Sequence, residues 1–274
     1  MRVLLCNDDG IHAPGIQALH QHLARTLSPD ELFTVAPATV QSATSHGITF
    51  TEPLMTETVD LGGGYGGIAV DGRPADCIKL ALSELWPDRF GAGAAPDLVV
   101  SGMNAGANCG INVIYSGTVA AAIEAAFLGI PSIAVSLHLG RGPVDFDEGA
   151  RQGVRAIHAV LASNRLAPHE CLNINVPRCE SEGDCKPAGD LPISVCPMNT
   201  HGVVDRYDRR QTPWGKTYYW PAAGGLDFHK TDAGTDVDRL FARHITVTPL
   251  SFDLTRHADL VSWADALKPA DDAR

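Results

Sequence analysis

The 274-residue sequence lacks several features that mark common classes of protein. Its apolar runs all fall short of the ~18 residues that a membrane-spanning helix needs, and its first apolar run is too short for a signal peptide. Positive charge is in deficit, with 21 Lys and Arg against 32 Asp and Glu and a formal net charge of −11. We therefore expect neither a nucleic-acid polymer nor a membrane as partner.

Two further absences concern thiol and phosphate chemistry. The seven cysteines include no C-x-x-C pair, and Cys179 and Cys185 flank an acidic loop without completing a set of zinc ligands. Because disulfides are rare in the cytoplasm, we expect reduced thiols and a cytoplasmic location. No GxxxxGK[ST] motif occurs, and no GxGxxG follows the first apolar run, so the sequence indicates neither a Walker loop nor a dinucleotide fingerprint.

The first half of the chain alternates strand-like and helix-like segments. Four short apolar runs have the composition of strands buried on both faces: residues 2–6, 32–37, 97–102 and 132–137. Three segments have helical character, and two of them begin at a proline: residues 14–27, 74–86 and 118–129. This alternation predicts an α/β fold with a mostly parallel sheet.

The alternating strand and helix pattern ends at about residue 177. PISVCP, TYYW and HITVTPL read as antiparallel strands or extended arms outside the main sheet, and residues 258–267 as a closing helix. The Gly-rich residues 61–67 read as a hairpin or loop. We expect a core at 1–177 and a C-terminal extension at 178–274 that packs partly on it.

Four polar segments follow the predicted strands. They are NDDG at 7–10, QSATSHG at 41–47, SGMNAGANCG at 101–110 and YSGT at 115–118. Ligands of open parallel sheets bind outside the carboxyl ends of the strands. We therefore expect the four segments to meet at one edge of the sheet.

The adjacent carboxylates Asp8 and Asp9 are the first candidates for chemistry. Like charges at a strand end need compensation, and hard oxygens suit a divalent cation. Ser42 and Asn104 can add neutral oxygens, a set that favours Mg²⁺, Mn²⁺ or Ca²⁺ over zinc. The alternative is that one aspartate caps the helix that begins near Pro14.

Ser116, Gly117 and Thr118 precede an Ala-rich helix. Free N–H groups, two hydroxyls and the positive end of the helix dipole can bind a phosphate, which glycine allows to approach closely. The alternative is an ordinary Ser/Thr N-cap.

Other polar residues are weaker candidates. His12 and His46 can donate to a phosphate or move protons, or be structural, and Asn108 reads as a left-handed turn residue. Lys79 is a cation that a substrate can meet. Residues 206–220 combine aromatic and basic side chains, which suit a nucleobase or a subunit contact equally well. The candidate substrate contacts are Asn7, Ala43, His46, Arg206 and Tyr207.

Several segments resemble one known family in order and spacing, the SurE (survival protein E) phosphatases. They are NDDGIHAPGIQAL (7–19), VAPATVQSATSHGIT (35–49), DGRPADCIKLAL (71–82), LVVSGMNAGANCG (98–110), VIYSGTVAAAIEA (113–125), GIPSIAVS (129–136) and residues 234–255. The resemblance covers about residues 1–256. It implies a Rossmann-like, three-layer α/β/α fold and a metal-dependent phosphomonoesterase, or 5′-nucleotidase. Such enzymes hydrolyse nucleoside 5′-monophosphates, often 3′-monophosphates and in some members short polyphosphate.

The resemblance also implies roles for particular residues. It implies one divalent ion per subunit (Mg, Mn or Co, with Ca in crystals) at Asp8, Asp9, Ser42 and Asn104, with Asp8 or Asp9 as the catalytic base. It implies phosphate contacts at four positions: Asn104, Ser116, Gly117 and Thr118. It further implies a homodimer or homotetramer in which a C-terminal hairpin and tail exchange between subunits.

The chain departs from the family at the serine ligand, where the usual N-R-S-G is replaced by VQSA (40–43). Gln41 replaces an arginine and Ala43 a glycine, which affects rate and substrate range more than metal binding. Residues 179–192 resemble an insertion. Two alternatives to the phosphatase remain: a nucleotide-binding sensor with weak or no turnover, and a nucleoside N-glycosidase.

Overall fold

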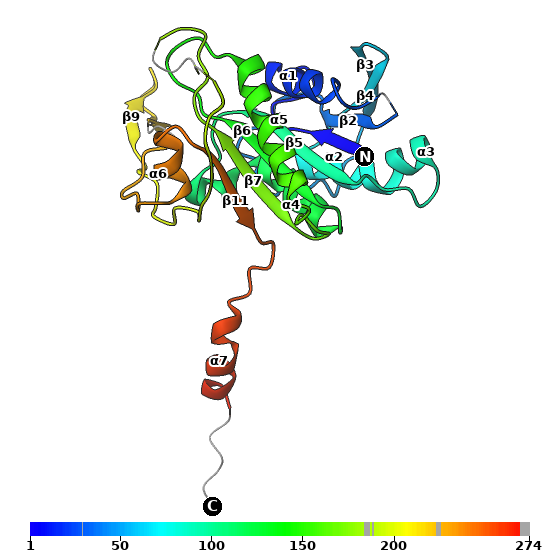
Figure 1. Cartoon of the computed structure of the whole chain (residues 1–274). Coiled ribbons are helices and arrows are strands. Elements are labelled where there is room, and N and C mark those ends of the chain that lie inside the picture. Colours follow the sequence, from blue (N-terminus) through cyan, green and yellow to red (C-terminus); the bar gives the residue numbers. More distant parts are fainter. Residues whose placement is uncertain (29, 184–186, 188, 223–225, 269–274) are drawn as a thin grey trace, which may run out of the picture.

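A nine-stranded sheet forms the centre of the molecule (Figure 1). The computed structural model describes residues 1–28, 30–183, 187, 189–222 and 226–268. The strand order is β3-β4-β2-β1-β5-β6-β7-β11-β8. Six strands from β4 to β7 run parallel: β4 (Tyr65–Val70), β2 (Leu32–Pro37), β1 (Val3–Cys6), β5 (Leu98–Ala105), β6 (Ser132–Leu137) and β7 (Cys171–Val176). The predicted mostly parallel α/β fold is confirmed.

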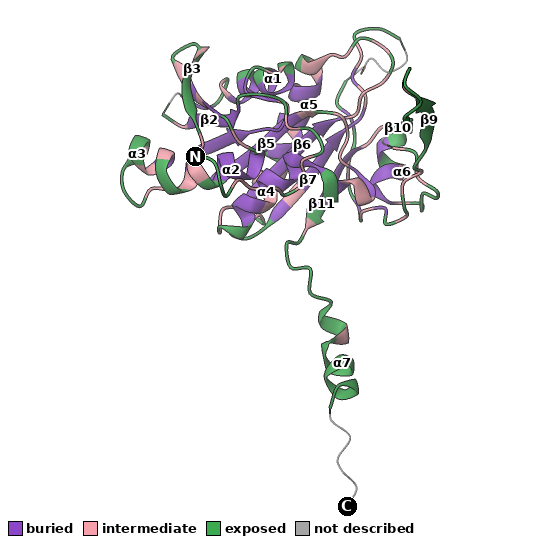
Figure 2. Cartoon of the chain, turned by 180° about the vertical axis from the view of Figure 1, so that it is seen from behind, coloured by how far each residue is buried: buried purple, intermediate pink, exposed green. Residues whose placement is uncertain are grey.

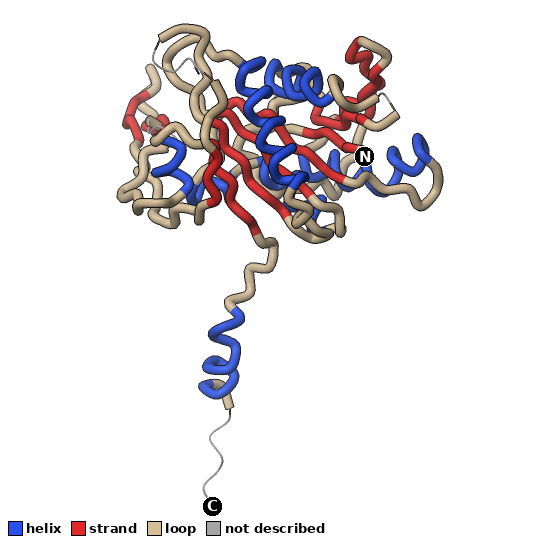
Figure 3. Tube along the Cα trace, in the orientation of Figure 1, coloured by secondary structure: helices blue, strands red, loops and turns tan. Residues whose placement is uncertain are grey.

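Helices cover both faces of this sheet, as the tube view shows (Figure 3). On one face, α1 (Pro14–Leu23) and α5 (Phe146–Ala162) pack their apolar side chains into one core cluster with β1, β5 and β6. On the other, α2 (Pro74–Leu80), α3 (Trp86–Phe90) and α4 (Gly117–Phe127) contribute to a second cluster. The three-layer arrangement follows from strands whose residues are buried on both faces.

The segment predicted as one helix at 74–86 is more irregular. A π-helical turn, η1 (Ala81–Leu85), joins α2 to α3. Pro87 lies in the first turn of α3. Because proline has no N–H and its ring crowds the preceding turn, a widened turn at this point has a local cause. Helix α5 and strand β7 were not predicted.

The Gly-rich residues 61–67 lie in a hairpin, as expected. Strand β3 (Thr56–Gly62) pairs antiparallel with β4. The three residues Gly62, Gly63 and Gly64 all have positive φ, between 61° and 85°, a conformation that glycine adopts without steric cost.

The expectation that PISVCP and HITVTPL lie outside the main sheet is wrong. Strand β11 (Ile245–Leu250) pairs antiparallel with β7, and β8 (Ile193–Val195) pairs parallel with β11. The first four residues of β11 are all buried, so this strand is interior rather than an exposed arm. The boundary expected at residue 177 is therefore not an end of the sheet.

The remaining C-terminal elements lie at the periphery. Strands β9 (Tyr207–Gln211) and β10 (Thr217–Pro221) form a separate antiparallel hairpin near α6 (Asp236–Phe241). A 3₁₀ turn, η3 (His257–Asp259), leads into α7 (Leu260–Ala266), which buries no residue and extends away from the body rather than packing on it (Figure 2). The segment 179–192 is only partly described, since residues 184–186 and 188 lie outside the described part. No helix in the described ranges is both long and apolar enough to cross a membrane.

Candidate active site

Asp8 lies two residues after the end of β1 and contacts the first turn of α4. Its carboxylate accepts hydrogen bonds from the Thr118 N–H, at 3.0 Å, and from the Thr118 hydroxyl. The Asp8 carbonyl accepts the Gln41 N–H at 2.7 Å. NDDG, QSATSHG and YSGT therefore meet at the carboxyl end of β1, as the sheet rule predicts.

The alternative that an aspartate caps α1 is wrong. The N-cap of α1 is Ala13, which makes no side-chain capping bond. Asp8 instead binds the N–H at the second residue of α4, a helix more than 100 residues away in the sequence. The partial positive charge of that helix end favours the ionised carboxylate.

Gly117 is required by the close approach of α4 to Asp8. A methyl group at Gly117 would lie 2.9 Å from Asp8 Cβ and 3.0 Å from Asp8 Oδ2. It would also lie 3.1 Å from Pro74 Cγ. Any larger side chain here would displace the carboxylate or the helix.

Ser116 is the N-cap of α4, and its hydroxyl oxygen accepts the Val119 N–H at 3.1 Å. Both donors of Thr118, which is fully buried, are used by Asp8. The Gly117 N–H has no hydrogen-bond acceptor among the residues that the structure describes. Within the described structure, three of the expected phosphate contacts therefore still have a donor to offer: the Gly117 N–H, the Ser116 hydroxyl and the second N–H of the Asn104 amide.

Asp9 is attached to the end of β5, at the residue that follows Asn104. The Ala105 N–H donates to Asp9 Oδ2 at 2.8 Å. The Asn104 side-chain amide donates to the Gly106 carbonyl at 2.6 Å, which fixes the side chain and leaves its carbonyl oxygen as an acceptor.

Burial shifts both aspartates toward the protonated form. Burial raises the pKa of Asp8 to about 6, with Asp9 adding to the rise and the Thr118 hydrogen bonds opposing it. Burial also raises the pKa of Asp9, against the Ala105 hydrogen bond. In the described part of the chain, neither carboxylate forms an ion pair with Lys, Arg or His. Two uncompensated carboxylates, one of them bound to the residue after Asn104, fit a hard divalent cation.

Ser42 lies on an exposed loop whose backbone is attached to Asp8 through Gln41. The following residue, Ala43, has a φ of 56°. This is the left-handed region that favours glycine. Glycine is also the residue that the N-R-S-G pattern has at this position.

Asn7 is fully buried and holds the turn rather than facing solvent. Its side-chain amide donates to the Gly10 carbonyl at 2.9 Å, while its Oδ1 has no partner in the described structure. Gly10 has a φ of 96°. We interpret Asn7 as part of the turn that presents Asp8 and Asp9.

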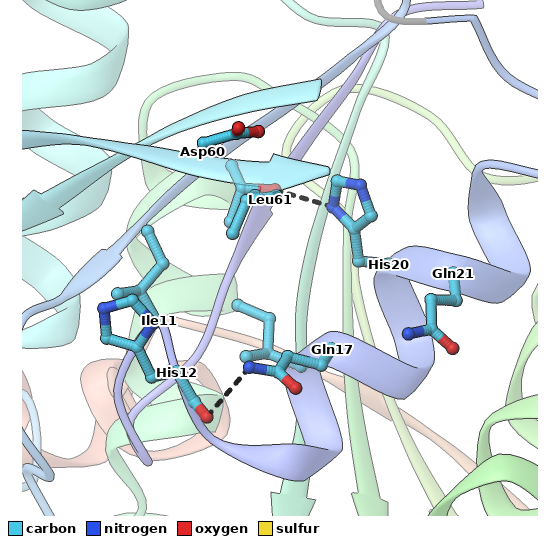
Figure 4. A pocket seen from close by; sticks show the side chains of 9 residues that line it. Ile11, His12, Gln17, His20, Gln21, Asp60 and Leu61 are labelled. Atoms are coloured by element: carbon cyan, nitrogen blue, oxygen red, sulfur yellow. Dashed lines mark hydrogen bonds between the residues drawn. The ribbon is translucent and has the colours of Figure 1, made fainter. Parts of the chain in front are cut away.

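In the described structure, the side chains of His12, His46 and Lys79 make no hydrogen bond or ion pair with Asp8 or Asp9. His12 lines a cavity of about 200 Å³ between α1, β2 and β3, beside His20, Gln17 and Asp60 (Figure 4). The Gln17 amide donates to the His12 carbonyl at 3.1 Å. Lys79 and His46 both contact Glu124.

Arg206 and Tyr207 lie at the β9–β10 hairpin and are exposed. No hydrogen bond or ion pair joins either one to Asp8, Asp9 or Asn104 within the described ranges. A role for them at this site remains a prediction.

A polar network around Asn108 was not predicted. Asn108 is not left-handed, contrary to expectation. Its N–H donates to Asn175 Oδ1, its side chain to Ser136, and its carbonyl accepts from Asn173 and Asn175. The available signal was CLNINV, in which two asparagines two residues apart share one face of an otherwise apolar strand.

Comparison with known proteins agrees with this geometry. The family model described as "Survival protein SurE" matches residues 3–199.

The chain belongs to the SurE family.

A relative named "5′-nucleotidase SurE" from Rhodopirellula baltica is 43% identical over 96% of each chain. "5′-nucleotidase SurE 1" from Thermus thermophilus is 41% identical over 98% of each. The crystal structure of the SurE protein from Aquifex aeolicus superimposes with a TM-score of 0.78 at 35% identity, covering 97% of this chain and 99% of that one. The family and the α/β fold expected from the sequence are therefore both confirmed.

Proposed function

We propose that this chain is a metal-dependent 5′-nucleotidase that hydrolyses nucleoside 5′-monophosphates to nucleoside and phosphate. The relatives' names support the reaction. The observation that carries the proposal is the position of the buried Asp8 carboxylate. It is hydrogen-bonded to Thr118 and packed against Gly117 at the start of α4, and Asp9 is the next residue in the chain. 3′-Monophosphates and short polyphosphate are secondary substrates in this proposal.

Asp8, Asp9, Ser42 and Asn104 are the residues that would hold one divalent ion, Mg²⁺, Mn²⁺ or Co²⁺. Bound there, the ion would neutralise phosphoryl charge and acidify a water molecule. The donor set fits, because it consists of oxygens only and its two carboxylates form no ion pair with a cationic side chain that the structure describes.

Four residues of the chain have distinct roles in substrate binding and proton transfer. Thr118 holds and orients Asp8. Ser116 and the Gly117 N–H bind the phosphate oxygens at the positive end of α4. Asp9 accepts the proton of the attacking water, because only one of its oxygens is used by a backbone N–H, whereas both Asp8 oxygens bind Thr118.

Product analysis by chromatography would test this function. Purified protein is incubated with 5′- and 3′-monophosphates of four nucleosides, with Mn²⁺, Mg²⁺ or excess EDTA. We expect nucleoside and phosphate in equal amounts, with EDTA stopping their release. Free base and ribose phosphate would indicate an N-glycosidase, and saturable binding without product would indicate a sensor.

We also propose a homodimer or homotetramer in the cytoplasm. Within residues 251–268, Phe252 packs against Phe127 on the body, no residue is fully buried, and α7 exposes Leu260, Val261 and Trp263. An apolar groove of about 1060 Å³ runs beside the end of β11, between Phe127 and Leu254. A second copy can cover these surfaces. The six described cysteines are free thiols, which is consistent with a reducing compartment.

A further inference from the structure

A buried carboxylate on α4 joins the helix to the loop that carries Ser42. Glu124 is 6% exposed, and its two oxygens have different partners. Oε2 lies 2.6 Å from His46 Nε2, and Oε1 lies 3.4 Å from Lys79 Nζ. Burial opposes ionisation of Glu124, but the His46 hydrogen bond and the charge of Lys79 lower its pKa below the usual value.

This contact links two parts of the proposed site. Glu124 lies six residues after Thr118, which holds Asp8, on the same helix. His46 follows Ser42 by four residues in the loop 41–49. The position of Ser42 relative to Asp8 therefore depends on how this loop is attached to α4.

The loop is attached to the body at several points besides His46. The Gln41 N–H donates to the Asp8 carbonyl, and Ser45 donates through its N–H to Tyr115 and through its hydroxyl to Ile114. At the far end of the loop, Thr49 donates twice to Asp76. Among these contacts, the hydrogen bond of His46 joins the middle of the loop to the buried carboxylate of Glu124 on α4.

The backbone of the loop has a conformation that its residues do not favour by themselves. Two of its residues that are not glycine, Ala43 and Ser45, have φ values of 56° and 54°. L-residues avoid this left-handed region unless surrounding contacts maintain it. Ala43 lies directly beside Ser42, so a loop released from its contacts would move the serine.

We propose that His46, held by Glu124, is a positioning residue that fixes the loop 41–49 so that Ser42 faces Asp8. The inference rests on the proposed function for its catalytic consequence, but its structural part can be tested separately. His46 acts through the loop and makes no contact with substrate in this proposal.

The experiment compares His46→Ala, His46→Gln and the control His158→Ala, which changes an exposed histidine on α5. The first measurement is hydrogen exchange of the Gln41 and Ser45 amides in the metal-free protein. We expect His46→Ala to speed both about tenfold while core amides of β1 keep wild-type rates. His46→Gln, which can still donate to Glu124, restores part of the protection, and His158→Ala changes nothing.

The second measurement is Mn²⁺ affinity by calorimetry, together with kcat and KM for a nucleoside 5′-monophosphate. We expect His46→Ala to weaken Mn²⁺ binding and lower kcat about tenfold, with a smaller change in KM. Glu124→Gln, which keeps the side-chain volume, provides a second route if His46→Ala does not fold, and it should shift the same readouts in the same direction.

The outcomes separate the two proposals. Wild-type exchange at Gln41 and Ser45 in His46→Ala, with unchanged Mn²⁺ affinity, would overturn the positioning role even if the wild-type enzyme is active. A wild-type protein that releases no phosphate would overturn the proposed function, whereas the exchange measurement would still decide whether His46 holds the loop.

Discussion

Two regions of the molecule differ in how far their side chains are packed: the carboxyl end of β1, and the C-terminal arms, by which we mean the hairpin 207–221 and residues 251–268. At the acidic edge, Asp8 binds Thr118 across 110 residues of sequence, and Asp9 binds Ala105 across 96. In the arms, Trp214 is 84% exposed and Leu254 94%. The α7 helix has no buried residue.

This difference indicates which functions one chain can perform alone. The acidic edge is assembled from segments of a single chain, and both aspartates accept hydrogen bonds from distant parts of that chain. The arms bury little apolar surface on their own body, which is the pattern of segments that are covered by another molecule. Substitutions at the acidic edge should therefore alter activity or stability, whereas substitutions in the arms should alter assembly.

The largest expected effect comes from Gly117→Ala. Because the added methyl group would lie 2.9 Å from Asp8 Cβ, we expect phosphate release to fall about 100-fold through displacement of the carboxylate. The matched control is Gly66→Ala on β4, where nothing lies within 4 Å of an added methyl group. Equal activity of the two variants would contradict the tight packing of α4 on Asp8.

The next effect concerns the charge of Asp8 and its dependence on pH. The folded-state pKa of about 6 exceeds the ordinary value of 3.8, so the folded protein binds more protons between these values. Stability of the metal-free protein should therefore decrease as pH rises through this window. By pH 7.5 the ionised Asp8 should cost roughly 3 kcal/mol.

Thermal unfolding of metal-free wild type and Asp8→Asn at pH 4 and pH 7.5 tests this cost. The asparagine can accept the Thr118 N–H and donate to its hydroxyl, so the packing is kept. We expect the variant to gain stability over wild type at pH 7.5 but not at pH 4. An advantage that is equal at both pH values would exclude ionisation of Asp8 as its cause.

A change in the arms should affect assembly without affecting the body. Trp263 is 64% exposed, so Trp263→Ser should change the stability of a single chain by less than about 0.5 kcal/mol. We expect the native mass, measured by light scattering, to fall toward that of one chain. Trp214→Ser separates the role of the hairpin tip from that of α7, and an unchanged mass in both variants would count against assembly through the arms.

The smallest effect is expected from Ala43→Gly. Relief of the left-handed conformation is worth about 1 kcal/mol, which the greater backbone entropy of unfolded glycine partly offsets. We expect a net stabilisation below about 1 kcal/mol by urea unfolding. The control Ala92→Gly, at an exposed position without positive φ, should be destabilised instead.

The sequence predicted what depends on local pattern. Residues 32–37 and 132–137 are continuous apolar runs, and they form β2 and β6 with the predicted bounds. The meeting of NDDG, QSATSHG and YSGT followed from the rule for parallel sheets, because each segment stands at a strand or helix end.

What the sequence did not predict depends on distant partners. Nothing local indicates that Thr118 uses both of its donors for Asp8, or that Asn108 is held by Asn173 and Asn175. The position of β11 between β7 and β8 likewise depends on pairing with strands that are distant in the sequence, and the composition of β11 does not show which strands these are. The helix α5 was missed although its first turn contains an Asp145 N-cap bond to Glu148.

The most direct test of the central proposal is phosphate release from adenosine 5′-monophosphate with Mn²⁺, before and after addition of EDTA. The proteins compared are wild type, Asp8→Asn and the control Asp60→Asn on β3. The account predicts EDTA-sensitive release by wild type and the control, and at least a roughly hundredfold loss in Asp8→Asn. Wild-type turnover in Asp8→Asn, or release that EDTA does not reduce, would contradict it.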